Sequence, residues 1–89
     1  YNDYRELEKA VNKAYDNCME RLHDIYPSIK DYELKACLLI KADVPLKNIA
    51  VNLGMEQNAL SMLRARLYKK MFQAKKGSAT MLDDFIKSL

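Results

Sequence analysis

Apolar residues recur at steps of three and four along most of this chain, which is the spacing of one face of an α-helix. Between residues 2 and 26 no glycine or proline interrupts the pattern, and its apolar positions are Leu7, Val11, Ala14, Cys18, Leu22 and Ile25. The pattern predicts one amphipathic helix of about 24 residues, roughly 36 Å long. It spans too few heptads to decide between packing on the rest of the chain and pairing as a coiled coil.

Four more helices are predicted after Pro27, which ends the first one because the residue before a proline disfavours the helical conformation. One runs from about residue 31 to 42. Two more stand on either side of a turn at residues 53–55, and the second of them covers about residues 56–72. A last helix follows the breaker Gly77, and one of its faces carries Leu82, Phe85, Ile86 and Leu89.

The pair of helices around the turn, residues 46–71, has the pattern of a helix-turn-helix motif. Ala50 is a small residue on the inward face of the first helix and lets the second helix cross closely. Gly54, four residues later, can take the positive φ that a sharp turn demands. The second helix then places an inward stripe at Leu60, Leu63, Leu67 and Met71. The alternative is an ordinary helical hairpin whose polar face is merely solvated.

These elements predict an all-α fold with two parts. Residues 1–26 form a long linker or dimerisation helix, and residues 27–89 form a compact four-helix domain that contains the helix-turn-helix. The sequence starts at Tyr1 and has neither a signal-peptide pattern nor an apolar run long enough to cross a membrane. We therefore expect a fragment of a longer polypeptide with upstream domains and no membrane contact of its own.

The net charge of +3 is unevenly distributed. Residues 35–77 carry nine basic and two acidic side chains, whereas residues 1–34 carry five basic and eight acidic ones. A basic region centred on a helix-turn-helix is the electrostatic pattern expected of a nucleic-acid-binding surface.

No pattern in the sequence indicates catalysis, a cofactor or a metal. It has no glycine-rich phosphate loop, no nucleophile near a histidine base and no paired carboxylates in an apolar setting. Cys18 and Cys37 lie on apolar helical faces without a ligand-spaced partner, which predicts free core thiols in a reducing compartment. The chain is therefore expected to be a cytoplasmic protein that is not an enzyme.

Residues 27–89 resemble the LuxR-type (GerE-like) C-terminal DNA-binding domain, most closely the version that ends many regulators of the Bacteroidetes group. The matching segments are Ile29, Glu33-Leu34, residues 47–53 in the first helix of the motif, residues 60–71 in the second helix, and residues 82–85 in the last. The resemblance implies the DNA-binding domain of a bacterial transcription regulator that inserts the helix at about 56–72 into the major groove. It also implies a homodimer that reads two half-sites of double-stranded DNA about one helical turn apart.

The resemblance also implies roles for individual residues. The base-facing positions of the family fall on Ser61, Met62 and Ala65. The residues assigned to phosphates and the DNA backbone are Lys47, Asn58, Arg66, Lys69 and Lys70.

A second hypothesis is a degenerate helix-turn-helix that serves protein association or dimerisation through the long N-terminal helix. It is favoured by Glu56 and Ala59, where the family places Ser or Thr, and by the uncharged base-facing positions. Arg64 has two possible partners, DNA or an acidic residue of the same chain. The two hypotheses differ in where five basic residues lie once the chain is folded: Lys47, Arg66, Lys69, Lys70 and Lys75. One shared face would favour DNA, and a scattered arrangement would favour association.

Overall fold

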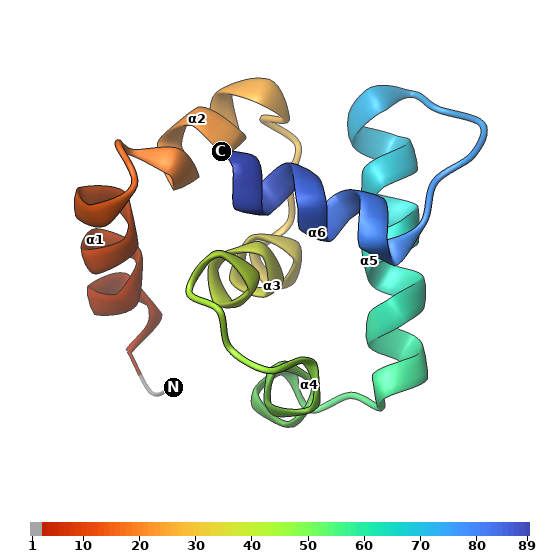
Figure 1. Cartoon of the computed structure of the whole chain (residues 1–89), viewed down its shortest axis with the longest axis horizontal. Coiled ribbons are helices and arrows are strands. Elements are labelled where there is room, and N and C mark those ends of the chain that lie inside the picture. The colour runs from red at the N-terminus through yellow and green to blue at the C-terminus, as the bar shows by residue number, and fades with distance from the viewer. Residues whose placement is uncertain (1–2) are drawn as a thin grey trace.

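The computed structural model describes residues 3–89, which form six α-helices and no strand (Figure 1). The helices are α1 (Tyr4–Ala14), α2 (Cys18–Ile25), α3 (Asp31–Lys41), α4 (Leu46–Leu53), α5 (Gln57–Phe72) and α6 (Ala79–Ser88). The predicted all-α class is confirmed. Each helix in this range is too short or too polar to span a lipid bilayer.

Helix α3 lies at the centre of the molecule, and the other helices surround it (Figure 1). Helix α4 lies below it in this view, α5 runs along the right-hand side, and α6 crosses in front of α5 and packs on α3 as well. Helices α1 and α2 occupy the opposite side, where α1 packs on both α2 and α3. Helix α5 therefore lies at the periphery, on the side away from α1.

The N-terminal region differs from the single helix expected over residues 2–26. It is divided into α1 and α2, and the chain turns at Asp16 and Asn17, which both adopt left-handed conformations with φ of 55° and 57°. Side chains hold both ends of this break. Asn12 Oδ1 accepts a 2.8 Å hydrogen bond from an amide at the start of α2, and the Arg21 guanidinium donates to two carbonyls that follow α1.

Core residues lie on both sides of the break. By turning, the chain buries Val11 from α1 together with Cys18, Met19 and Leu22 from α2, whereas Ile25, expected to point inward, is 45% exposed. The apolar spacing of a helix does not reveal such a turn, because each half keeps helical periodicity.

One continuous hydrophobic core joins all six helices, and α3 contributes most of its length to it. Every residue of α3 from Ala36 to Lys41 is buried. The largest aliphatic side chains that are fully enclosed are Met19, Leu22, Leu39, Ile49, Leu60, Leu67, Leu82 and Ile86. Helices α4, α5 and α6 are thus fixed relative to one another through shared core contacts.

Lys41 at the end of α3 secures the C-terminal end of α6. Its side-chain amine is buried and donates hydrogen bonds to the carbonyls of Lys87 and Leu89, at 2.8 and 2.9 Å. The same amine lies 4.5 Å from the centre of the Tyr15 ring, a cation–π distance. A cation at the carbonyl end of a helix is also favoured by the helix dipole.

Candidate nucleic-acid interface

Helices α4 and α5 are joined by a tight turn that begins at Gly54. Gly54 has φ of 66°, and its N–H donates to carbonyls of the last turn of α4. The N–H of Met55 also donates to the Ala50 carbonyl at 3.0 Å, so the end of α4 closes as a left-handed glycine cap. Ile49 and Ala50 are buried as expected, whereas Leu46, assigned to the same face, is 40% exposed.

Helix α5 has two opposite stripes. The residues at 60, 64, 67 and 71 are buried, and three of them are the predicted apolar residues. The fourth is Arg64 in place of the predicted Leu63, which is only half-buried. A stripe with the same spacing, shifted by two residues, lies about 200° around the helix and consists of Asn58, Met62, Ala65 and Lys69. This outward stripe contains four of the eight residues assigned from the sequence.

The three base-facing residues lie on or beside the outward stripe. Met62 is 45% exposed, Ser61 is exposed and Ala65 is half-buried. None is an Arg, Asn or Gln, the residues that read bases with paired hydrogen bonds. The surface they form suits methyl contacts and single hydrogen bonds.

Three of the assigned cations make no ion pair within the described residues. Lys47 on α4 and Arg66 on α5 are exposed, and Lys69 is half-exposed. Arg66 lies about 60° around the helix from Lys69, so these two charges share one side of α5. Asn58, also assigned to the backbone, is exposed in the first turn of α5.

Lys70 is different, because its amine lies 2.7 Å from the carboxylate of Glu33 on α3. The Glu33 side chain is 3% exposed, and its other oxygen accepts a 2.9 Å hydrogen bond from the Lys30 N–H at the start of α3. The hydrogen bond with Glu33 raises the pKa of Lys70. Lys70 therefore ties the end of α5 to the start of α3, and its charge is balanced within the chain.

Arg64 also has an intramolecular acid. Its side chain is 6% exposed, and its Nε lies 3.3 Å from Asp83 Oδ1 on α6. The pair is close enough for an electrostatic contact, although neither atom has a well-directed hydrogen bond. Burial raises the pKa of Asp83, and Arg64 opposes that rise. Arg64 thus joins α5 to α6 and faces away from the outward stripe.

Glu56 occupies the N-cap position of α5 and is exposed. Its side chain makes no capping hydrogen bond in the described structure. A carboxylate here is favoured by the helix dipole but opposes a phosphate that approaches the same helix end.

Two basic residues next to this surface were not assigned from the sequence. Lys75 and Lys76 are exposed in the loop after α5. The sequence does indicate a basic segment here, because no Asp or Glu occurs between Glu56 and Asp83.

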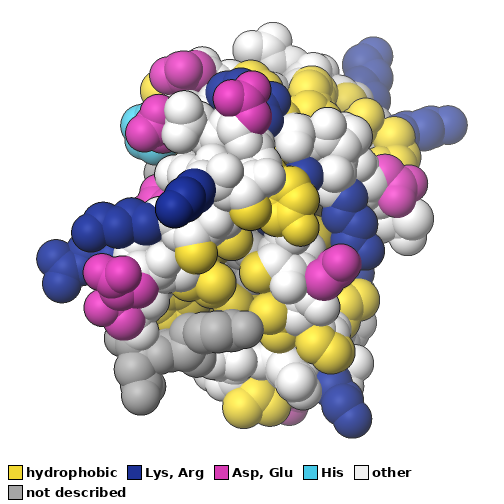
Figure 2. All heavy atoms as spheres, turned by 60° about the vertical axis from the view of Figure 1, so that its left-hand side comes forward, with side chains coloured by type: hydrophobic (Ala, Val, Ile, Leu, Met, Phe, Trp, Pro, Cys, Tyr) yellow, Lys and Arg dark blue, Asp and Glu magenta, His cyan; other side chains and the backbone are white. Residues whose placement is uncertain are grey.

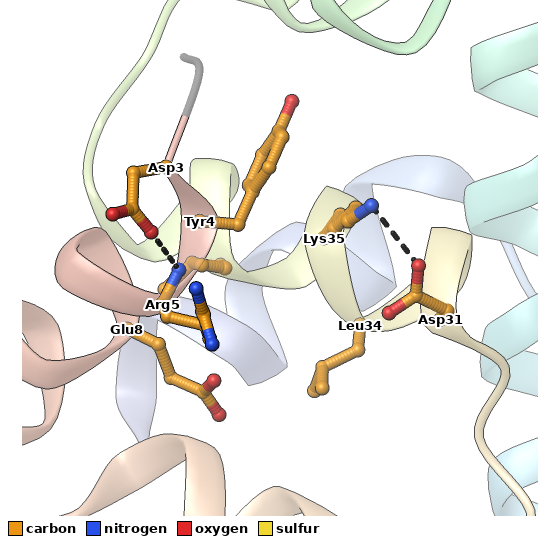
Figure 3. A pocket seen from close by; sticks show the side chains of 8 residues that line it. Asp3, Tyr4, Arg5, Glu8, Asp31, Leu34 and Lys35 are labelled. Carbon is orange, nitrogen blue, oxygen red and sulfur yellow. Dashed lines mark hydrogen bonds and ion pairs between the residues drawn. The ribbon is translucent and has the colours of Figure 1, made fainter.

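A groove of about 460 Å³ lies on the far side of the molecule, between α1 and α3. Figure 2 shows this side of the molecule, where acidic and basic side chains are interspersed around apolar ones. In Figure 3 the marked interactions stay within each wall: Lys35 pairs with Asp31 at 3.0 Å, and Asp3 caps α1 through the Arg5 N–H. Arg5 and Glu8 also line the groove and make no ion pair within the described residues, and no marked interaction crosses from one wall to the other. Within residues 3–89 no three His, Cys, Asp or Glu side chains are grouped to hold a metal ion.

No family model matches the chain, and no match occurs among the curated proteins or the solved structures compared with it. Function is therefore inferred from the residues and their geometry.

Proposed function

We propose that this chain is the DNA-binding output domain of a bacterial transcription regulator, similar to the LuxR type, and that α5 enters the major groove of double-stranded DNA. The observation that carries this proposal is the outward stripe of α5. Asn58 and Met62 of this stripe are exposed, Ala65 and Lys69 are half-buried, and the opposite stripe of this peripheral helix is fixed in the core by α4 and α6. A helix presented in this way can approach the floor of a groove about 12 Å wide.

The proposed contacts fall into two groups. Lys47, Arg66 and Lys69 contact phosphates, which fixes the register of the helix but carries no sequence information. Ser61 and Met62 face base edges, with Ala65 behind them. Because methyl contacts and single hydrogen bonds discriminate weakly, we expect a small ratio of specific to nonspecific affinity for one domain. Asn58, in the first turn of α5, contacts the DNA backbone.

Weak readout by one domain is compensated when two domains bind together. We propose that the protein acts as a homodimer in the cytoplasm and reads half-sites about one helical turn apart, roughly 34 Å. Within one copy the apolar stripe of α1 packs on the core of the same chain: Val11 is buried, and Tyr4 and Leu7 are half-buried.

The test is a titration of generic duplex DNA by fluorescence anisotropy at about 50 and 200 mM salt. Each phosphate contact contributes about −0.9 to the slope of log affinity against log salt. Counted for one bound domain, three contacts give a slope of about −2.7, so a fourfold rise in salt should weaken binding roughly 40-fold, and a bound dimer should show about twice this slope. Absent or salt-independent binding at low salt would refute the proposal.

Lys69→Ala and Lys13→Ala form a matched pair for this titration. Lys69 lies on the outward stripe, and its loss should make the slope shallower by about one. Lys13 lies in the last turn of α1 on the opposite side of the molecule, and its loss should leave the slope unchanged. Equal slopes for the two variants would remove the phosphate assignment of Lys69.

Protein association is a second candidate function, favoured by apolar exposure on α4. Val51 is 79% exposed, and it lines a shallow groove of about 390 Å³ together with Ala50 and Met55. A single exposed apolar residue is common on monomeric proteins, but here Val51, Ala50 and Met55 lie together in one groove. Its other lining residues are polar or charged: Lys47, Asn48, Glu56 and Gln57. If a second copy covers this groove, Val51→Glu should lower the sedimentation mass from dimer to monomer. An unchanged mass would exclude this surface as the dimer contact.

A further inference from the structure

The loop after α5 does not project freely into solvent but returns along the helix. Gln73 adopts a left-handed conformation with φ of 51°, which ends α5, and the Ala74 N–H donates to the Lys69 carbonyl at 3.0 Å. The loop then passes beside the C-terminal half of α5 and leads into α6, which crosses α5 (Figure 1). The start of the loop is thus hydrogen-bonded to the last turn of the helix.

Gly77 fixes the other end of the loop by a close approach to α5. A Cβ atom at this position would lie 2.8 Å from Tyr68 Cδ1, 3.0 Å from Lys69 Cγ and 3.4 Å from the Ala65 carbonyl oxygen. The first two separations are shorter than ordinary carbon contacts of about 3.5–4.0 Å. Glycine therefore lets the loop lie directly against Ala65 and Lys69, the C-terminal half of the outward stripe, and against the neighbouring Tyr68.

Lys75 and Lys76 lie between these two attachment points. Both are exposed and form no ion pair within the described residues. Lys70, by comparison, is neutralised by Glu33. The two loop lysines therefore add uncompensated positive charge beside the C-terminal half of α5, in the same region as Arg66 and Lys69.

The loop and α4 lie at opposite ends of α5 (Figure 1). A helix of 16 residues is about 24 Å long, which exceeds the roughly 12 Å width of the major groove. A helix that enters the groove therefore has room for a backbone contact at each end.

On this basis we propose that Lys75 and Lys76 bind phosphates of duplex DNA at the C-terminal end of α5, opposite the contact made by Lys47, and that Gly77 positions them. This inference rests on the proposed DNA-binding function. It adds two contacts that do not depend on base sequence to a helix whose base-facing residues are weak readers. Nonspecific affinity of the domain then depends on the loop as much as on α5.

The test compares the double variant Lys75→Ala/Lys76→Ala with the wild-type chain in the same salt titration. With five phosphate contacts the wild-type slope should be about −4.5, and the double variant should fall to about −2.7. The matched control Lys9→Ala/Lys13→Ala removes two charges from α1, on the far side of the molecule, and should keep the wild-type slope.

The outcomes separate the two proposals. A wild-type chain that shows no salt-dependent DNA binding overturns the proposed function and this inference together. A wild-type chain that binds with a steep slope, and a double variant with the same slope, overturns the loop contact and leaves α5 as the DNA-binding element.

Gly77→Ala tests the positioning role without a change in charge. The added methyl group collides with Tyr68 and Lys69, so the loop should move away from α5 and the slope should fall between the other two values. Far-UV circular dichroism establishes that the variant is still helical. A folded Gly77→Ala chain with the wild-type slope would show that the close approach does not position the lysines.

Discussion

Lys69 and Lys70 are adjacent in sequence, but of the two only Lys70 has an ion-pair partner within the described residues. Replacing each one separately by alanine should therefore have different effects. Lys70→Ala removes the amine that lies 2.7 Å from the buried carboxylate of Glu33. Lys69→Ala removes a side chain from the outward stripe. We expect the first substitution to reduce stability and the second to reduce DNA affinity.

The magnitude follows from the burial of the two partners. Removing one partner of a fully buried ion pair costs about 3–5 kcal/mol, because the remaining charge stays desolvated. Here the Lys70 side chain is 44% exposed, so water can reach the carboxylate once the amine is gone, and the Lys30 N–H still donates to Glu33. Because water can reach the carboxylate, we expect a smaller effect than for a fully buried pair: Lys70→Ala should lower the free energy of unfolding by about 1–2 kcal/mol. In a domain of this size that lowers Tm by about 4–16 °C.

The measurement is urea unfolding followed by circular dichroism, because the chain has no tryptophan. Lys69→Ala serves as the matched control and should change the free energy of unfolding by less than about 0.5 kcal/mol. In the DNA titration the order reverses: Lys69→Ala should lower the salt slope by about one, and Lys70→Ala should lower it by much less. Equal stabilities of the two variants would refute the structural role of the pair with Glu33.

Three further predictions concern the fold. Asn12→Ala removes the side-chain acceptor for the N–H of Met19 at the start of α2 and should lower the free energy of unfolding by about 1 kcal/mol. Asn17→Gly places glycine at a left-handed position and should raise the free energy of unfolding by up to about 1 kcal/mol. Thermal melts of both variants check these two values. Burial raises the pKa of Cys37 to about 12, while an unfolded thiol titrates near about 8.5. The protonated thiol therefore contributes stability that is fully present below about pH 8.5 and is lost as pH rises toward 12. By pH 10 the loss is about 2 kcal/mol. In urea melts, the free energy of unfolding of Cys37→Ala should fall less steeply with rising pH than that of the wild-type chain. Leu67→Ala should lower the free energy of unfolding by about 2–5 kcal/mol. Val51→Ala should lower it by less than about 0.5 kcal/mol. Equal losses would contradict the assignment of Leu67 to the core and Val51 to the surface.

The sequence by itself determined the secondary structure of most of the chain and the turn of the helix-turn-helix. The periodicity of α3 through α6 is local information, and Gly54 is the residue that a left-handed helix end favours. The same periodicity located the outward stripe of α5, because a residue two positions from a buried one lies on the other side of a helix. The sequence alone therefore predicts that Asn58, Met62 and Lys69 lie on the side of α5 opposite the core.

Tertiary structure decided what local periodicity does not encode. The division into α1 and α2 lies between Val11 and a second group of core residues, Cys18, Met19 and Leu22, and each half of that stretch keeps its helical pattern. The fate of each basic residue depends on partners far along the chain, such as Glu33 for Lys70 and Asp83 for Arg64, which are 37 and 19 residues away. Local sequence shows that α5 is basic, but only packing shows which of its charges are compensated within the chain.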